Sequence, residues 1–241
     1  MASKTPTRSI VPTLDVESAL WADGRSLVCG VDEVGRGALA GPVVAAAVVL
    51  PRHAPAWLFD LRDSKALLPQ ERERLAALIR AQACCWSIGS AAPAVIDSVN
   101  ILQATFVAME RAVAGLRPCA DVALVDGSQL PRLPCETIGM VDGDAYVASI
   151  AAASILAKVA RDGLMTALDR RYPGYGFAAH KGYSCPSHRR ALLDMGVTPV
   201  HRRTFASVRS RLCGDGYLEH LVALDITSPN GRGKQPGSGE E

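Results

Sequence analysis

The stretch CGVDEVGRGALAGPVVAAAVVL, from Cys29 to Leu50, decides how this chain folds. Its first end carries Val31 and Val34 and its second end is a run of Val and Ala, which is typical of buried strands, and the glycines between them allow a wide loop. We therefore predict an antiparallel pair of strands over residues 27–33 and 43–50. Asp32 and Glu33 stand at the end of the first strand. Because neighbouring carboxylates repel one another and are costly to bury, the pair indicates a nearby cation, unless both acids simply lie in water at the strand end.

Helix and strand patterns alternate through the rest of the chain. Residues 121–126 have the sequence DVALVD, a short apolar run that is typical of a central parallel strand whose last side chain points into a crevice. Asn100 is a good N-cap for a long helix, and Pro69 suits the first turn of an earlier one. Further strands are predicted at 84–89 and 136–141, and helices at 69–82, 100–116, 145–161, near 187–195 and from about 204. This order predicts an α/β fold with a mixed sheet covered by helices.

Length and composition bound the kind of protein. With 241 residues, 49% of them hydrophobic, the chain suits one large domain or one domain with a small appendage. The seven Cys form no C-x-x-C pair and we see no signal peptide, which together favour reduced thiols over disulfides or a zinc site. The longest apolar run, residues 42–50, is too short to span a bilayer. We therefore expect a cytoplasmic protein without a membrane partner, with a disordered tail from about residue 228.

Charge is distributed unevenly along the chain. Between Arg161 and Arg211 there are ten Lys and Arg against three Asp, although the net charge of the whole chain is only +2. A basic C-terminal third beside an acidic remainder is typical of a protein that binds a polyanion next to a carboxylate site. On charge alone, a solvated helical surface explains the same pattern equally well.

Four acids are candidates for one metal site. Asp126 ends the apolar strand and Asp144 precedes the Ala-rich helix, so both can join Asp32 and Glu33. Carboxylate oxygens suit Mg²⁺ or Mn²⁺, and such a cluster can hold two metals roughly 3.5–4 Å apart that act on a phosphodiester. Taken singly, Asp126 is equally explained as a turn residue and Asp144 as a helix N-cap. Neighbouring strand residues point to opposite faces, so the first two acids converge only if the strand twists or ends there.

Six blocks of the sequence resemble the bacterial ribonuclease HII family, and they follow one another in order between residues 27 and 212. They are VDEVGRGALAGP (31–42), DSK (63–65), LVDG (124–127), GDAYVASIAAASILAKVARD (143–162), YGFAAHKGY (175–183) and HRRTF (201–205). The resemblance implies an RNase H-like mixed five-stranded sheet, with three antiparallel strands followed by parallel strands, flanking helices and a C-terminal helical region. We accordingly divide the chain into a flexible lead-in (1–26), a catalytic domain (27–212) and a C-terminal extension (213–241).

The resemblance also implies an activity. Members of the family are hydrolases, endonucleases that cut RNA within RNA–DNA hybrids and at single ribonucleotides embedded in duplex DNA. The cut falls on the 5′ side of the ribonucleotide and leaves a 3′-hydroxyl and a 5′-phosphate. The implied cofactor is Mn²⁺ or Mg²⁺, with two ions during catalysis. The implied partners are RNA–DNA hybrids and ribonucleotide-containing duplex DNA, and we expect a monomer.

Residues match the family's functional motifs position by position. Gly35, Arg36 and Gly37 match the loop that recognises the ribose 2′-hydroxyl, the group that distinguishes RNA from DNA. Tyr183 matches the tyrosine that packs on the following deoxyribose. Asp142 is a rival for the fourth metal ligand. The four matched metal ligands are Asp32, Glu33, Asp126 and Asp144.

Basic side chains are candidates for phosphate contacts, which position a duplex without reading its sequence. Lys158 lies in an apolar helix and therefore needs an acidic or phosphate partner. Many relatives carry Ser and Thr where this chain has Ala145 and Cys185, and the lost hydroxyls could weaken a phosphate contact. The histidines at 180, 188 and 201 fit structural roles better than chemistry. The candidate cations are Lys65, Lys158, Lys181, Arg189, Arg190, Arg202 and Arg203.

Three other interpretations stay open. One is an enzyme similar to ribonuclease HIII that lacks its extra N-terminal domain. Another is a catalytically silent protein that binds RNA–DNA hybrids, although four carboxylates weaken binding to a polyanion. The last is an exonuclease or nucleotidyl transferase with an RNase H fold, which the Gly-Arg-Gly loop and the downstream tyrosine disfavour.

Overall fold

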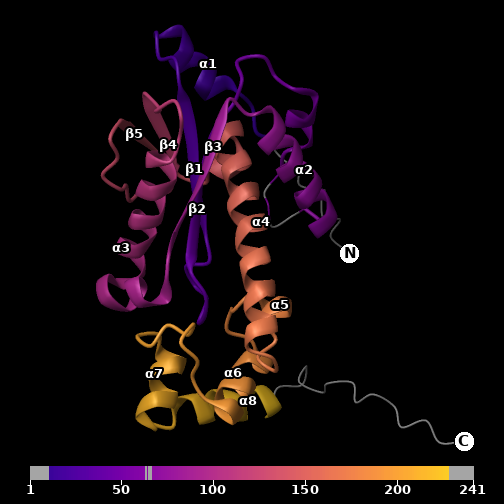
Figure 1. Cartoon of the computed structure of the whole chain (residues 1–241), viewed down its shortest axis with the longest axis vertical. Helices are drawn as coiled ribbons and strands as arrows, with labels where there is room; N and C mark the ends of the chain where they lie inside the picture. The colour runs from indigo at the N-terminus through magenta and orange to yellow at the C-terminus, as the bar shows by residue number, and fades with distance from the viewer. Residues whose placement is uncertain (1–10, 63, 65–66, 228–241) are drawn as a thin grey trace, which may run out of the picture. The chain divides into compact units, whose positions relative to one another are not determined.

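The computed structural model of the chain describes residues 11–62, 64 and 67–227 (Figure 1). Its internal contacts form two units. The sheet unit runs to Arg36 and resumes over Gly41–Leu164, and the helical unit consists of Gly37–Ala40 together with the chain from Met165 onward. The predicted disordered tail from residue 228 lies outside the described residues.

Five strands form the mixed sheet that we predicted, in the order β3-β2-β1-β4-β5. β1 pairs antiparallel with β2 and β2 with β3, whereas the β1–β4 and β4–β5 pairs are parallel. The two central strands β1 and β2 and their neighbour β4 are buried almost throughout, which explains their runs of Val and Ala. The strands are β1 (Val28–Val34), β2 (Val43–Val49), β3 (Cys85–Ala91), β4 (Val122–Asp126) and β5 (Glu136–Met140).

Helices cover both faces of the sheet (Figure 1). One face packs against α3 (Pro93–Ala114), and the other packs against α2 (Pro69–Gln82) and α4 (Ala148–Arg171). Ala46 and Val48 of β2 share an apolar cluster with residues of α2 and α4. Because side chains alternate along a strand, the odd-numbered residues of β2 turn toward α3. A short 3₁₀ helix, η1 (Ala56–Asp60), adds Trp57 and Leu58 to the cluster on the α4 side.

Glycine allows a helix to approach the sheet closely on each face. A Cβ at Gly30 would lie 2.1 Å from the carbonyl carbon of Ser149 in α4, and a Cβ at Gly89 would lie 2.1 Å from the carbonyl oxygen of Ala108 in α3. Neither contact leaves room for a methyl group. The position of Gly30 therefore assigns the even-numbered residues of β1 to the α4 face and the odd-numbered residues to the α3 face.

The segment before β1 contains a helix where we predicted a flexible lead-in. It is α1 (Asp15–Ala22), on which Glu17 is fully buried. The Oε1 atom of Glu17 accepts the backbone N–H of Ser149 at 2.8 Å, so this carboxylate caps the first turn of α4. The two residues are 132 positions apart, which is why local sequence patterns did not reveal the contact.

Two of the predicted helices have different bounds in the structure. α3 begins at Pro93 and has a break at Asn100, where φ is 68°. The Asn100 side chain accepts the backbone N–H of Gln103 at 3.1 Å, as expected for an N-cap. α4 begins at Ala148, after the 3₁₀ turn η2 (Gly143–Ala145), and continues to Arg171.

Short helices and residues 37–40 build the helical unit. The backbone N–H of Leu39 donates to Gly182 O at 2.8 Å, and Leu39 O accepts the N–H of Arg202 at 2.8 Å. Leu39 also packs in an apolar cluster with Leu192 and Val208. Within residues 11–62, 64 and 67–227, every helix is too short or too polar to cross a membrane. The helices that lie wholly in this unit are α5 (Phe177–His180), α6 (Pro186–Met195), α7 (Ala206–Cys213) and α8 (Tyr217–Thr227).

His188 and His201 lie in the core of the helical unit, and their side chains are 0% and 1% exposed. Burial lowers the pKa of each ring from 6.5 to about 4. The nearby rings add to this shift, His180 acting on His188 and His188 acting on His201. The folded chain therefore holds both histidines neutral at pH 7.

We predict that Gly30→Ala destabilises the protein strongly, by about 3 kcal/mol or more, because the new methyl group meets the backbone of α4. Gly163→Ala is the matched control, since a Cβ at Gly163 in the same helix meets nothing within 4 Å. Gly163→Ala should raise the free energy of unfolding by about 0.5–1 kcal/mol, because Ala favours a helix interior over Gly. Urea unfolding measures both values. Equal effects at the two positions would contradict the close packing of β1 on α4.

We also predict an acid-sensitive stability that depends on the buried histidines. The pKa of each ring is about 4 in the folded protein and 6.5 in the unfolded chain. The contribution of the neutral rings to the free energy of unfolding is therefore full above pH 6.5 and is lost as the pH falls from 6.5 toward 4. Between pH 7 and pH 5 the loss is about 2 kcal/mol for each ring. Urea unfolding at the two pH values measures this loss. The free energy of unfolding of His188→Asn should fall between pH 7 and pH 5 by about 2 kcal/mol less than that of the wild type. An identical loss in both proteins would contradict the assignment.

Candidate active site

Asp32 and Glu33 lie near the end of β1 and face opposite sides of the sheet. Asp32 faces α4, where the hydroxyl of Ser154 hydrogen-bonds to it. Glu33 faces α3 and lines a cavity of about 160 Å³ beside that helix. β1 ends one residue later, at Val34. The two carboxylates are therefore neighbours at one edge of the sheet, although they do not share a face.

Burial raises the pKa of both carboxyl groups. Asp32 is only 6% exposed, and the charges of Glu33 and Asp126 raise its pKa further. For Glu33, the guanidinium of Arg36 opposes the effect of burial, with Arg36 Nη1 3.3 Å from Glu33 Oε1, and the charge of Asp126 reinforces it. The net shift remains upward in both cases. The acids therefore repel one another without full compensation, which is the electrostatic condition that a divalent cation relieves.

Asp126 stands next to Asp32 because β1 and β4 are parallel and in register. Val31 pairs with Val125, one step before the two acids. Asp126 also lines the cavity that Glu33 lines, together with Gly127 to Gln129 and the side of α3. The end of β4 thus delivers a carboxylate to the same sheet edge, as the apolar run before it predicted.

The turn that precedes α4 brings the residue before Asp144 into contact with Asp126. The backbone N–H of Gly143 donates to Asp126 Oδ1 at 2.8 Å, and Asp144 is the next residue. Asp144 is half-buried, whereas Asp142 is exposed and has a left-handed backbone with φ 54°. Of the two rivals for the fourth place, burial therefore favours Asp144.

The acids approach one another in pairs and do not form a closed cage. Among the residues that the structure describes, no three His, Cys, Asp or Glu side chains are arranged to hold a metal ion. The donors that meet at this edge are nevertheless carboxylate oxygens with raised pKa values. Such hard, repelling donors fit Mg²⁺ or Mn²⁺ and fit soft metals poorly.

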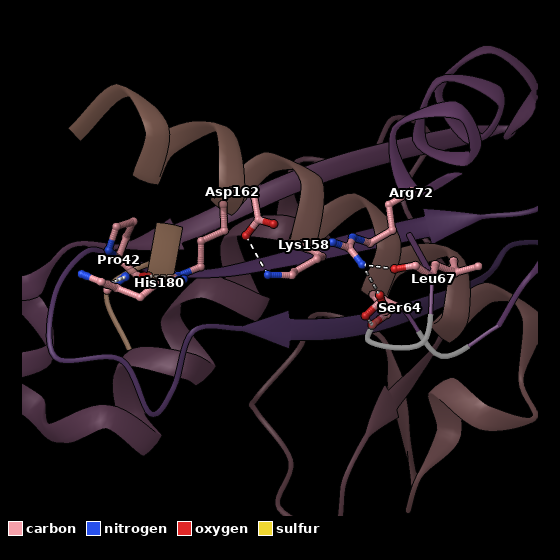
Figure 2. Close-up of polar contacts among 10 residues, drawn as sticks. Pro42, Ser64, Leu67, Arg72, Lys158, Asp162 and His180 are labelled. Atoms are coloured by element: carbon pink, nitrogen blue, oxygen red, sulfur yellow. Dashed lines mark hydrogen bonds and ion pairs between the residues drawn. The ribbon is translucent and has the colours of Figure 1, made fainter. Parts of the chain in front are cut away.

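Two serines connect the DSK block to Asp32. Ser154 Oγ lies 3.0 Å from Ser64 Oγ, and both residues are buried. The guanidinium of Arg72 donates to the carbonyl oxygen of Ser64 at 3.0 Å and also to that of Leu67, so it holds this loop (Figure 2). Lys65, for which we predicted a phosphate contact, lies outside the described residues.

Arg161 supports the Gly-Arg-Gly loop from the interior of the sheet unit. It is fully buried, and its Nε donates to the carbonyl oxygen of Pro42 at 2.9 Å. Gly35 has φ +94°, and a Cβ there would lie 2.1 Å from Arg161 Nε. Glycine is therefore required at position 35 both for its backbone conformation and for the space that the guanidinium occupies.

Gly37 and Tyr183 lie together in the helical unit. A Cβ at Gly37 would lie 3.9 Å from Cε1 of Tyr183, and Ala38 forms an antiparallel bridge with Tyr183. The tyrosine is 38% exposed. Its ring thus lies beside the last glycine of the Gly-Arg-Gly loop and stays partly exposed.

The predicted phosphate contacts have different environments. Arg202 is fully buried and lies over the ring of Phe205 at 5.1 Å, so its phosphate contact stays a prediction that this burial disfavours. Lys158 donates to Asp162 at 2.7 Å, the acidic partner that its helix requires (Figure 2). Lys181 is half-buried and Arg203 is exposed.

Two further predicted cations form ion pairs. Arg189 holds Asp225 through two hydrogen bonds, of 2.9 and 2.5 Å, and also donates to Ser184. Arg190 pairs with Asp194 at 2.8 Å on the surface. A phosphate would have to compete with a carboxylate at both positions.

Sequence patterns missed Arg161 and Ser154. Both lie in the Ala-rich helix α4, and their partners Pro42, Asp32 and Ser64 come from distant segments. A signal was present, since an Arg and a Ser on the buried side of an apolar helix need polar partners. The sequence could not say which partners these are.

Comparisons with known proteins identify the family. A family model described as Ribonuclease HII matches residues 29–208. The Ribonuclease HII of Desulfitobacterium hafniense (strain Y51) is 53% identical over 196 residues, which cover 81% of this chain and 75% of the relative. That of Paracoccus denitrificans (strain Pd 1222) is 52% identical over 205 residues, which cover 84% of this chain and 95% of the relative.

Solved structures share the fold. The ribonuclease H2 from Pyrococcus horikoshii OT3 superposes with a TM-score of 0.67 at 27% identity, covering 77% of this chain and 97% of that chain. Bst-RNase HIII, crystallised in complex with Mn²⁺, has a TM-score of 0.59 at 20% identity, covering 78% of this chain and 69% of that chain. The second likeness concerns the fold alone. The chain belongs to the ribonuclease HII family and is an endonuclease of the ribonuclease H type.

Proposed function

We propose that this protein hydrolyses the phosphodiester on the 5′ side of ribonucleotides, in RNA–DNA hybrids and at single ribonucleotides embedded in duplex DNA, with Mg²⁺ or Mn²⁺ as cofactor. The observation that carries the proposal is the group of carboxylates at one edge of the sheet, in which Asp32 is buried and the other three acids are half-buried. Buried acids with raised pKa values are unfavourable in a protein unless a cation uses them. Membership of a family of phosphodiester-cleaving enzymes supports a catalytic use of that cation.

The acids that would hold the metal are Asp32, Glu33, Asp126 and Asp144. When bound, divalent cations activate a water for in-line attack and stabilise the charge on the phosphate and on the leaving oxygen. Asp126 is central to this set. It lies next to Asp32 and lines the same cavity as Glu33. It also accepts a hydrogen bond from the backbone N–H of Gly143, the residue before Asp144. Arg36 restrains the flexible Glu33 side chain through their ion pair.

The Gly-Arg-Gly loop and Tyr183 are proposed to select the substrate. Recognition of a ribose 2′-hydroxyl by backbone groups requires close approach, which glycines permit. The guanidinium of Arg161 packs against Gly35 and hydrogen-bonds to the carbonyl oxygen of Pro42, and Gly37 lies beside the Tyr183 ring. A flat ring next to this loop would pack on a deoxyribose and would meet a 2′-hydroxyl on the same sugar sterically.

Two alternatives remain distinguishable from this proposal. A catalytically silent hybrid-binding protein would gain nothing from buried carboxylates, which repel a polyanion. An enzyme with the specificity of ribonuclease HIII would cut RNA–DNA hybrids in the same way and would differ at single ribonucleotides. The first experiment separates the proposal from both alternatives, and cleavage of an RNA–DNA hybrid separates the two alternatives from each other.

The first experiment uses a labelled DNA duplex with one internal ribonucleotide, incubated with Mn²⁺ or Mg²⁺, and an all-DNA duplex as control. We expect one nick on the 5′ side of the ribonucleotide, which leaves a 3′-hydroxyl, and no nick in the control. Asp126→Asn should lower the rate by more than about a hundredfold, because a ligand is lost where even a supporting residue typically costs 10–100-fold. No metal-dependent nick in the wild-type protein would reject the proposal.

Stability separates a metal role of Asp126 from a structural one. The Asn side chain can still accept the N–H of Gly143, and removing one charge relieves repulsion, so the melting temperature of Asp126→Asn without metal should equal or exceed that of the wild type. Mn²⁺ should raise the melting temperature of the wild type more than that of the variant. Asp142→Asn is the matched control and should keep both activity and the response to Mn²⁺.

We predict that Tyr183→Ala slows incision at a single ribonucleotide by roughly ten- to hundredfold, the range expected for loss of an aromatic stacking contact. Tyr183→Phe keeps the ring and should retain most of the rate. Cleavage within a long RNA–DNA hybrid should fall less, because that substrate offers few RNA–DNA junctions. If the Ala and Phe variants behave alike on the single ribonucleotide, the ring has no role in selection.

A further inference from the structure

The backbone of Tyr183 is attached to a chain of hydrogen bonds that passes through two buried histidines. His188 Nδ1 lies 2.9 Å from the carbonyl oxygen of Tyr183, and His188 Nε2 lies 3.2 Å from His201 Nε2. His201 Nδ1 accepts the backbone N–H of Thr198 at 3.0 Å and lies 2.8 Å from its hydroxyl. All of these residues belong to the helical unit.

These contacts allow only one set of proton positions. A carbonyl oxygen accepts, so His188 must carry its proton on Nδ1 and leave Nε2 as an acceptor. His201 must then donate from Nε2, which leaves its Nδ1 to accept from Thr198. Both rings are neutral, and every donor points the same way, from Thr198 through His201 and His188 to Tyr183. A second proton on either ring would place two N–H groups against each other.

The surroundings of the two rings hold them in this arrangement. His180 stacks on His188 with ring centroids 4.4 Å apart, and the ring of Phe177 meets His188 edge-on at 5.5 Å. Tyr175 lies 5.3 Å from His201. The titratable or charged groups near the pair are His180, Arg189, Tyr175 and the buried Arg202. The positive groups among them oppose protonation of the pair.

Tyr183 is held on its other side as well. Its backbone N–H donates to His180 O at 2.9 Å, and the preceding Gly182 accepts the N–H of Leu39 at 2.8 Å. His180 in turn accepts the N–H of Gly182 at Nδ1 and donates from Nε2 to Tyr175 O at 2.7 Å. His188 hydrogen-bonds to the carbonyl oxygen of Tyr183. The carbonyl and the phenol ring belong to the same residue, so a fixed carbonyl also restricts the direction of the ring.

We propose that His188 and His201 are positioning residues for Tyr183: their one-way chain of hydrogen bonds fixes the Tyr183 carbonyl and thereby aims the exposed ring beside Gly37. This inference rests on the proposed role of Tyr183 in recognising the sugar. A histidine that only filled the core would need neither a particular tautomer nor a partner at the tyrosine backbone. The two rings are buried and reach the tyrosine through its carbonyl, so they act through Tyr183.

A matched pair of substitutions at position 188 tests the inference. In His188→Asn the amide N–H₂ occupies the place of Nδ1 and can still donate to the Tyr183 carbonyl. In His188→Gln the amide lies near the place of Nε2, so the contact with His201 can form and the donor to Tyr183 is lost. Both variants lose one ring and should have similar melting temperatures.

The readout is the ratio of two rates in the same full-length protein, incision at a single ribonucleotide over cleavage within a long RNA–DNA hybrid. We expect His188→Gln to lower this ratio by about tenfold, the size of one lost orienting hydrogen bond, and His188→Asn to lower it by less than about threefold. In the double variant with Tyr183→Ala, His188→Gln should lower the ratio no further. Equal ratios in the Asn and Gln variants would overturn the inference.

A spectroscopic measurement tests it independently of activity and of the variants' stability. Nitrogen-15 NMR of the wild-type protein at pH 7 should show His188 as the Nδ1–H tautomer and His201 as the Nε2–H tautomer, with Thr198→Val altering the His201 signals. The opposite tautomer on His188 would overturn the inference. Failure of the proposed function would look different, because then Tyr183→Ala would leave the ratio of rates unchanged while the tautomers stayed as described.

Discussion

Parallel pairing between β1 and β4 sets the position of the acids, since it brings the ends of two strands to one edge of the sheet. The register that matches Val31 with Val125 places Asp32 and Asp126 side by side immediately afterwards. A shift of one residue would send one of these carboxylates to the other face. The hydrogen bond from Gly143 to Asp126 then fixes where the turn before α4 begins, and with it the place of Asp144.

The two faces of β1 give Asp32 and Glu33 different roles. Asp32 is enclosed against α4 and belongs to a polar connection with Ser154 and Ser64. Glu33 opens into the cavity beside α3, where Arg36 restrains it. In the proposed metal site, an enclosed carboxylate beside a more accessible one would suit a cation that must also admit a phosphate. Gly30 makes this possible, because it lets α4 approach the strand closely enough to cover Asp32.

Sequence patterns were sufficient wherever a residue's role depended on its neighbours in the chain. The apolar runs predicted the order of strands, Asn100 was found as a cap, and Asp126 was expected at the end of a parallel strand. They failed where the role depended on a distant partner. Arg202 has the charge of a phosphate ligand and the burial of a core residue, and Glu17 caps a helix that begins far along the chain. The histidines were correctly assigned to structure, but their direction toward Tyr183 became visible only with the distances between ring nitrogens.

Residues 37–40 belong to the helical unit although they are synthesised between two strands of the sheet unit. Leu39 and Ala40 bond to Gly182 and Arg202, and Ala40 also forms a bridge with His201. The helical unit is therefore incomplete as a C-terminal fragment, and a ribosome must finish nearly the whole chain before these four residues find their partners. Cutting the gene at the boundary near residue 164 would separate no independent module, because residues 37–40 of the helical unit would stay with the N-terminal piece. The Gly-Arg-Gly motif is divided in the same way, between Arg36 and Gly37, so exchanging either unit in evolution or in the laboratory also exchanges part of this motif.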